Sequence, residues 1–423
     1  MPKRSPRPAA TAAPAPPPPA ARRRAVAHSG ALLRSGGLAS LAALALAACT
    51  GQIRSVPLAH GTPERPPATT AHALHRLVED GAPGAASLIT RAGFAAARYS
   101  TAGVADLRSG RRMAPQDHFR AGSLTKTLVA TVVLQLVAEG RLALNDHVTA
   151  HLPPGVPATG DGDGDGDGDD RSELRRVTIR QLLDHTSGLF NYTQDSRLSK
   201  QLYGKGFGAH RYDSHTPAEL LRIALSHPPV AVPGTRYAYS NTNYLVLGLV
   251  IEAVTGNPYA TEIRRRILVP ARLDHTSFPG TDPVLPEPHG RAYSRAGARR
   301  VDATSLDPSR AGAAGEMVTT LGDLNRFFAA LLAGRFLAPR QMAQIRNEKG
   351  TGGAYGLGLY ATRLPCGVTV WGHNGDINGS YARTAGTADG RHLVSYRANT
   401  DTLPDPAHGT AVLTAEFCTS RRR

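Results

Sequence analysis

Strand-like segments at both ends of this 423-residue chain enclose a long stretch with helical patterns. Near the start, ASLITRAG (86–93) and FAAARYSTAG (94–103) predict two strands around a glycine turn. Near the end, GVTVWG (367–372), SYARTAG (380–386) and HLVSYRANT (392–400) predict an antiparallel meander. We therefore predict an α/β fold of the α+β type, in which both termini build one central antiparallel sheet flanked by helices.

Apolar helix patterns fill the stretch between these strand segments. They predict helices at Ser123–Glu139, from Val177–Leu189 onward, at Asn243–Val254 and at Met317–Gly334, and a last helix that ends near Cys418. Gly140 and Gly256 are typical helix stop signals. Thr319 and Thr320 supply an N-cap region for the helix that follows them.

The order of these segments predicts two domains. We expect a sheet domain of residues 71–145 and 290–420, with a mostly helical domain, residues 146–289, inserted into it. The helical part contains DGDGDGDGDD, residues 161–170, which begins like a calcium-binding EF-hand loop. Such a loop needs a glutamate at its twelfth position, and counting from Asp161 that position is Ser172. We expect a solvated acidic loop, and no metal or cofactor.

The N-terminus has the pattern of an export signal. A basic segment precedes the apolar stretch Leu38–Ala48, which is too short to span a bilayer. The next residue completes Leu-Ala-Ala-Cys, which resembles the bacterial lipobox and predicts a lipid on Cys49. We expect a lipoprotein signal peptide in residues 1–48, a flexible tether in 49–70, and a protein held on the outer face of the cytoplasmic membrane. The alternative is an ordinary signal peptide with a chance cysteine.

The basic charge does not indicate a nucleic-acid-binding protein. The net charge is +16, and residues 1–48 carry seven basic residues and no acidic ones, which leaves 16 − 7 = +9 for the rest. The remaining basic residues form no stripe interleaved with aromatic residues. A moderately cationic surface instead favours anionic cell-surface polymers or lipids.

Two cysteines remain beyond Cys49, at positions 366 and 418. In an exported protein two cysteines predict one disulfide. Closing a loop of this size would stabilise the fold by about 4 kcal/mol if only chain entropy counts. Two buried free thiols are the alternative.

Lys126 lies in an otherwise small or apolar segment, although the chain strongly prefers arginine. Only 5 of its 49 basic residues are lysines. On a helix, Lys126 can reach the hydroxyl of Ser123 one turn earlier. A buried lysine can lose its proton and activate a serine nucleophile, whereas an arginine cannot. Ser-x-x-Lys alone occurs by chance in a chain of this length, so the prediction needs partner residues.

A first partner segment is Tyr239-Ser240-Asn241, which follows Pro-Gly and precedes an apolar helix. Beside a lysine ammonium the phenolate of Tyr239 would be favoured, and this residue could shuttle protons. Asn241 could offer an amide to a substrate carbonyl. Taken alone, the segment is equally consistent with a capping and packing loop.

A second partner segment is Trp371-Gly-His-Asn-Gly-Asp376 on a predicted strand. His373 would place a titratable cation opposite the serine. Gly375 would let a substrate backbone lie close to the strand edge. The N–H of Asp376 could form an oxyanion hole together with that of Ser123 near the helix N-terminus. A lone histidine in a chain that has 16 is more often structural.

Together, Ser-x-x-Lys, Tyr-x-Asn and His-x-Gly in this order resemble the penicillin-recognising serine hydrolases, on the side of the class C β-lactamases. Longer stretches, such as VTIRQLLDHTSGL and PGTRYAYSNTNYLVLGLVIEAVTG, are similar to secreted serine D-alanyl-D-alanine carboxypeptidases. The resemblance covers roughly residues 75–420. It implies a β-lactamase/transpeptidase-like fold and a disulfide between Cys366 and Cys418.

The resemblance also implies a role for each motif residue. Ser123 would be the acylated nucleophile, Lys126 its base, Tyr239 the proton shuttle and His373 the cationic third element. The substrate-binding residues implied in this way are Asn241, Asn374, Gly375 and Asp376.

Two departures from the carboxypeptidase pattern concern the leaving-group side. The residue after GLGL is Tyr360, where the similar carboxypeptidases have an arginine that holds the terminal carboxylate of the peptide. The middle residue of the third motif is Asn374, where they usually have a hydroxyl residue. Arg363 is nearby but out of register on a strand. These changes leave acyl transfer intact and affect the choice of substrate.

Three hypotheses follow. The first is a D-alanyl-D-alanine carboxypeptidase that acts on cell-wall stem peptides and binds β-lactams, anchored to the membrane and monomeric, with no nucleic-acid partner. The second keeps the chemistry but acts on an ester, a D-amino-acid amide or a β-lactam. The third is a wall-binding or β-lactam-sensing lipoprotein without catalysis, which would have no use for an activated Ser123.

Overall fold

The computed structural model describes residues 69–93, 96–156, 173–402 and 408–419. The chain divides into residues 1–64 and 65–423, and all described residues belong to the second unit. The predicted signal peptide, Cys49 and the acidic loop 161–170 lie outside them. Within the described ranges no helix is both long enough and apolar enough to cross a membrane.

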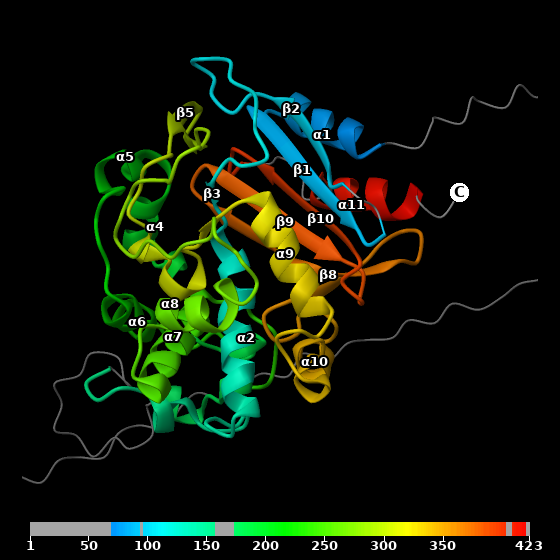
Figure 1. Cartoon of the computed structure of the whole chain (residues 1–423). Helices are drawn as coiled ribbons and strands as arrows, with labels where there is room; N and C mark the ends of the chain where they lie inside the picture. The colour runs from blue at the N-terminus through cyan, green and yellow to red at the C-terminus, as the bar shows by residue number, and fades with distance from the viewer. Residues whose placement is uncertain (1–68, 94–95, 157–172, 403–407, 420–423) are drawn as a thin grey trace, which may run out of the picture. The chain divides into compact units, whose positions relative to one another are not determined.

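A six-stranded antiparallel sheet is built by both ends of the described chain, as predicted (Figure 1). Its strand order is β2-β1-β10-β9-β8-β7. The strands are β1 (Gly84–Arg91), β2 (Arg98–Gly103), β7 (Tyr360–Arg363), β8 (Thr369–Ile377), β9 (Ser380–Gly386) and β10 (His392–Ala398). The first strand and the last lie side by side, with Ala85 opposite Ala398 and Arg91 opposite His392.

Helices cover both faces of this sheet. The terminal helices α1 (Thr70–Glu79) and α11 (His408–Thr419) pack on one face and share an apolar cluster with Val370, Val394 and Tyr396. Helix α9 (Leu321–Leu332) crosses the other face, as Figure 1 shows. This second face also meets the large core that surrounds helix α2 (Thr125–Ala138).

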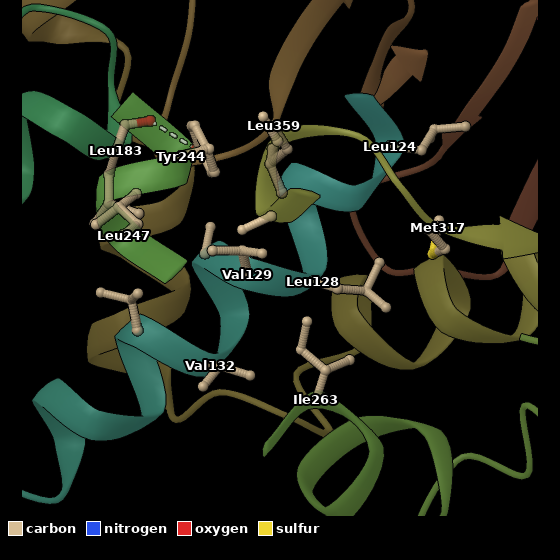
Figure 2. Close-up of a cluster of buried hydrophobic side chains, with 14 of the residues drawn as sticks. Leu124, Leu128, Val129, Val132, Leu183, Tyr244, Leu247, Ile263, Met317 and Leu359 are labelled. Atoms are coloured by element: carbon tan, nitrogen blue, oxygen red, sulfur yellow. Dashed lines mark hydrogen bonds between the residues drawn. The ribbon is translucent and has the colours of Figure 1, made fainter. Parts of the chain in front are cut away.

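Helix α2 is the central helix of the core. Its side chains are buried on almost every side, so the helix is enclosed and not amphipathic. Figure 2 shows Leu128, Val129 and Val132 packed among residues of α7 (Asn241–Thr255) and α8 (Tyr259–Ile263). The short 3₁₀ turn η1 (Gly122–Leu124) precedes α2 and contacts β8. The core therefore fixes the N-terminal end of α2 and the adjoining η1, which carries Ser123, against the sheet.

The inserted part of the chain is mostly helical, as predicted. Besides α7 and α8 it contains α3 (Ile179–Leu183), α4 (Ser196–Leu202), α5 (Phe207–His210) and α6 (Pro217–Leu225). The division into a sheet domain and a helical domain stays a prediction.

The remaining elements are short. They are α10 (Pro339–Ile345), the hairpin of β4 (Tyr293–Ala296) and β5 (Arg299–Asp302), and the two-residue pair β3 (Phe119–Arg120) and β6 (Val318–Thr319). The predicted N-cap region at Thr319 and Thr320 is confirmed, and the preceding residues Met317 and Val318 lie outside the helix. Thr319 pairs with Phe119, and Thr320 caps α9 by accepting a hydrogen bond from the N–H of Asp323.

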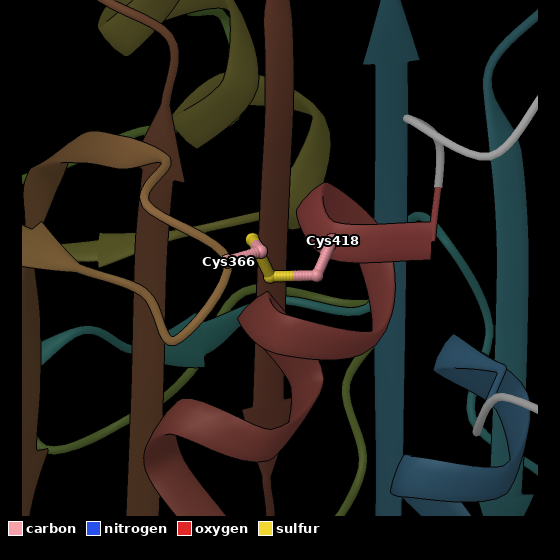
Figure 3. Close-up of a disulfide and its surroundings, with 2 residues drawn as sticks. All are labelled: Cys366 and Cys418. Atoms are coloured by element: carbon pink, nitrogen blue, oxygen red, sulfur yellow. A yellow bond between two sulfur atoms is a disulfide. The ribbon is translucent and has the colours of Figure 1, made fainter.

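A disulfide joins Cys366 to Cys418, the pairing that the resemblance implies (Figure 3). Cys366 lies in the turn between β7 and β8, and Cys418 lies in the last turn of α11. The bond closes a loop across 52 positions and ties α11 to the β7–β8 hairpin.

Candidate active site

The structure brings Ser123 and Lys126 together at the start of α2. Lys126 is 0% exposed, and its Nζ lies 2.8 Å from Ser123 Oγ. Two further oxygens contact the same nitrogen: Asn241 Oδ1 at 2.8 Å and the carbonyl oxygen of Ala314 at 2.6 Å. The lysine therefore has three oxygen neighbours and no carboxylate among them.

Burial lowers the pKa of Lys126 well below its ordinary value. Asn241 Oδ1 and the Ala314 carbonyl can only accept hydrogen bonds, so they take two N–H groups of the amine. In the neutral amine this leaves the nitrogen lone pair facing the hydroxyl of Ser123. The arrangement lets Lys126 accept the serine proton.

Tyr239 completes the contacts of the nucleophile. Its hydroxyl donates to Ser123 Oγ at 2.8 Å, and Lys126 Nζ lies 5.0 Å from its ring centroid. Burial raises the pKa of Tyr239, so the residue is a neutral phenol and the expected phenolate is wrong. Tyr239 can therefore donate a proton, while Lys126 can accept one.

His185 supports Tyr239 from behind, a contact that the sequence analysis did not assign. Its ring is fully buried and lies 4.2 Å from the ring of Tyr239. Its carbonyl accepts the N–H of Ala238, and its Nδ1 lies 3.0 Å from Asn243 Nδ2. The only available signal was its place in DHTSGL, which the sequence analysis used for the resemblance alone.

His373 lies on β8 but is not the expected cation. Its Nδ1–H donates to the carbonyl of Asn374, and its Nε2 accepts from the hydroxyl of Tyr355 at 2.7 Å. Burial lowers the pKa of His373 to about 3, so the ring is neutral near pH 7. This corrects the expected charge, because a buried imidazolium without a paired carboxylate is not stabilised.

Strand β8 and the turn η1 touch at two glycines. A Cβ on Gly375 would lie 1.8 Å from the carbonyl oxygen of Ala121 and 2.9 Å from the nitrogen of Ser123. A Cβ on Gly122 would lie 2.7 Å from the nitrogen of Asp376. The close contact brings the backbone nitrogens of Ser123 and Asp376 to one place, as an oxyanion hole requires. Gly375 is therefore needed for contact with η1, and its role in the approach of a substrate stays a prediction.

The expected binding site for a terminal carboxylate is filled by side chains. The hydroxyl of Tyr360 donates to Asn374 Oδ1 at 2.7 Å. The Tyr360 ring lies 5.4 Å from that of His373 and 6.0 Å from that of Tyr355. Arg363 points elsewhere, since it is mostly exposed and pairs with Glu348 at 3.0 Å. Asn374 was expected to bind substrate, and here its amide oxygen is used by the protein.

A cavity of about 460 Å³ opens beside Ser123 on the side away from Tyr360, toward the C-terminal end of β8. Ser123, Asn241 and Asp376 lie in its wall. The rest of the wall comes from residues 192–193, 202–204, 294–295, 310–311, 314–315, 377–378 and 401–402. In the part of the chain that the structure describes, no group of three His, Cys, Asp or Glu residues is placed to hold a metal ion.

A serine that contacts a buried lysine and a tyrosine on this scaffold defines the class of serine hydrolases to which the resemblance pointed. The chain belongs to the Beta-lactamase family, whose model matches residues 69–417.

Comparison with known proteins finds relatives of different kinds. The D-stereospecific amidohydrolase from Streptomyces sp. is 40% identical, with a TM-score of 0.74, and the match covers 83% of this chain and 98% of that one. Esterase EstB from Burkholderia gladioli is 30% identical over 295 residues, 64% of this chain and 71% of that protein. The Bacillus subtilis protein PbpX is 27% identical over 273 residues, which span 64% of this chain but only 59% of that protein.

Proposed function

We propose that the chain is a serine amidohydrolase that cleaves amides of D-amino acids or short D-peptides through an acyl-enzyme on Ser123. The observation that carries this proposal is the position of Ser123 Oγ, 2.8 Å from Lys126 Nζ and 2.8 Å from the Tyr239 hydroxyl. The similarity to the Streptomyces D-stereospecific amidohydrolase supports the substrate class.

The proposed chemistry has two stages. Ser123 Oγ forms a bond to the amide carbon while its proton passes to Lys126, and the oxyanion binds to the N–H groups of Ser123 and Asp376. The C–N bond then breaks, and Tyr239 gives its proton to the leaving amine. The proton that Lys126 took from Ser123 then passes within the site to Tyr239, which becomes a neutral phenol again. Water repeats the sequence on the ester, which releases the acid and returns Ser123 to its free form.

Tyr360 and Asn374 occupy the leaving-group side of the site. This supports a simple amide as the substrate over a peptide with a free C-terminus. A terminal carboxylate would need a cation, and at position 360 the chain offers a tyrosine bonded to Asn374. The D-alanyl-D-alanine carboxypeptidase is the second candidate. One observation favours it: Arg383 lies directly opposite Asn374 on β9, with its guanidinium 5.9 Å from the Tyr360 ring centroid.

The first test compares D- and L-phenylalaninamide as substrates of the wild type and of Ser123→Ala. We expect hydrolysis of the D-amide in preference to the L-amide, and a loss of at least about 10³-fold in kcat for Ser123→Ala. Ser196→Ala, at an exposed position in α4, is the matched control and should keep full activity. Equal turnover of both enantiomers, or activity that survives in Ser123→Ala, would contradict the proposal.

Tyr360→Arg tests the second candidate. The new guanidinium, next to Arg383, should bind a terminal carboxylate and raise kcat/KM for an N-acylated D-Ala-D-Ala peptide by about tenfold or more. Tyr360→Phe is the control, because it removes the hydrogen bond to Asn374 without adding a charge. If the arginine variant is no better than the phenylalanine variant, the missing cation is not what excludes such peptides.

The cellular setting is part of the same proposal. Export and a lipid on Cys49, which would hold the enzyme at the outer face of the cytoplasmic membrane, are supported by the sequence pattern alone. We also propose that it acts as a monomer. There the enzyme would meet D-amino-acid peptides derived from the cell wall.

A further inference from the structure

Two carboxylates line the cavity beside the nucleophile. Asp376 lies near the end of β8 and is open to the cavity. Asp401 follows β10, and its Oδ2 accepts the hydroxyl of Ser294 at 2.5 Å. Within the described chain its buried Oδ1 has no hydrogen-bond partner, and neither carboxylate is in an ion pair with an arginine or lysine. The site thus presents two neighbouring carboxyl groups that no cation of the described chain neutralises.

Arg310, in the same cavity wall, is a second polar group with an unused hydrogen-bonding atom. It is 4% exposed, and its Nη2 donates to Asn378 Oδ1 at 2.6 Å. Its Nη1 has no partner among the described residues. A wall with an unused acceptor at Asp401 and an unused donor at Arg310 suits a polar, charged ligand group better than an apolar one.

The electrostatics of the carboxylate pair point to a cation. Although its side chain is open to the cavity, loss of hydration between the cavity walls raises the pKa of Asp376 to about 8, and the nearby Asp401 contributes in the same direction. Without a nearby cation this carboxyl group is therefore largely protonated near pH 7. Arg295 and Arg310 line the cavity without lowering the pKa of either carboxyl group. An ammonium group between the two carboxyl groups would lower both pKa values and favour their ionised forms, so the pair is suited to bind a cation.

The cavity lies on the acyl side of the scissile bond. The leaving-group side is where the resemblance places a terminal carboxylate, beside Tyr360 and Asn374. The cavity extends from Ser123 in the other direction along β8, toward Asn378 and Asp401. In an amino-acid amide the α-amino group is attached one carbon from the reacting carbonyl. A carbonyl bound at the N–H of Asp376 therefore places that amino group close to the carboxylate of the same residue.

We propose that Asp376 and Asp401 form a subsite for the protonated α-amino group of the acyl residue. The enzyme then selects substrates whose scissile D-residue has a free amino group, and it disfavours N-acylated ones. The inference rests on the proposed amidohydrolase function and deepens it. It also separates this chain from a carboxypeptidase, whose scissile residue is N-acylated by the preceding peptide.

The test compares D-phenylalaninamide with N-acetyl-D-phenylalaninamide near pH 7. We expect the wild type to prefer the free amine by about tenfold or more in kcat/KM, the scale of a charge-assisted hydrogen bond. Asp401→Asn and Asp376→Asn should each reduce this preference by about tenfold. Asp274→Asn, at an exposed position outside the cavity, is the matched control and should keep it. An equal or reversed preference, or a parallel loss on both substrates, would overturn the subsite.

Calorimetric titration of Ser123→Ala with the same two compounds reads the preference without turnover. If the wild type hydrolyses neither amide but Ser123→Ala binds the free amine at least tenfold more tightly, the proposed function fails and the subsite stands. If the wild type hydrolyses neither amide and Ser123→Ala binds both compounds equally, the proposed function and the subsite both fail.

Discussion

Lys126→Arg is expected to abolish acylation of Ser123, with a loss of at least about 10³-fold in the single-turnover rate. A guanidinium stays protonated in a protein and cannot accept the serine proton. The wild-type lysine can, because burial lowers its pKa and its two other contacts are acceptors only. Stopped-flow measurement with a chromogenic D-phenylalanine ester gives the rate directly.

Two further variants test whether that loss of activity comes from unfolding of the protein. A larger charged group in a fully buried space can unfold the protein, so Lys126→Met, of similar length and neutral, is measured beside it. We expect Lys126→Met to give a cooperative thermal transition and still to lack acylation. Lys200→Arg, at an exposed position in α4, should match the wild type. A Lys126→Met rate within tenfold of the wild type would exclude Lys126 as the base.

Gly375→Ala is expected to have the second-largest effect, on both activity and stability. The added methyl group would lie 1.8 Å from the carbonyl oxygen of Ala121, so η1 and β8 must move apart. That movement separates the nitrogens of Ser123 and Asp376, and the loss of one oxyanion donor costs about 10²–10³-fold in kcat. Overpacking of this kind typically destabilises a fold by about 1–3 kcal/mol. Steady-state kinetics and urea unfolding measure the two effects.

Gly208→Ala in α5 is the matched control for this substitution. A Cβ there would meet no atom within 4 Å, and its backbone does not lie in the left-handed region. The variant should keep its activity and its stability. Full activity in Gly375→Ala would mean that the contact between η1 and β8 does not shape the oxyanion site.

The architecture was predictable because strands at the two ends of the chain carry strong local signals. The alternating pattern around Leu88 and Val394, with glycine-rich turns, marks strands that need partners, and joining the ends supplies them. The N-cap of α9 was also predictable from its local pattern, whereas the short strand β6 just before it was not. Thr319 pairs with Phe119, which lies 200 positions away, and no local pattern reports that pairing.

The chemistry of the site was predictable in residue identity but not in charge. Ser123, Lys126 and Tyr239 were chosen by motif, and the structure places them in contact. The protonation of Tyr239 and His373 depends on burial by distant segments, which removes the charge expected for each.

Contacts made by residues outside the motifs could not be predicted from the sequence either. The carbonyl of Ala314, 188 positions from Lys126, carries no side-chain signal in the sequence. Asp401 comes into the cavity because β10 and β8, which flank β9, end at the same edge of the sheet. Such groups become visible only when the whole chain is folded.

The most direct test of the central claim is the intact mass of the protein during turnover of a D-phenylalanine ester, quenched in acid. An ester acylates quickly, so the acyl-enzyme should accumulate before water releases it. We predict a mass increase of one D-phenylalanyl group, located on the peptide that contains Ser123 and absent in Lys126→Met. Consumption of the ester with no adduct, or an adduct on any other residue, would contradict an acyl-enzyme on Ser123.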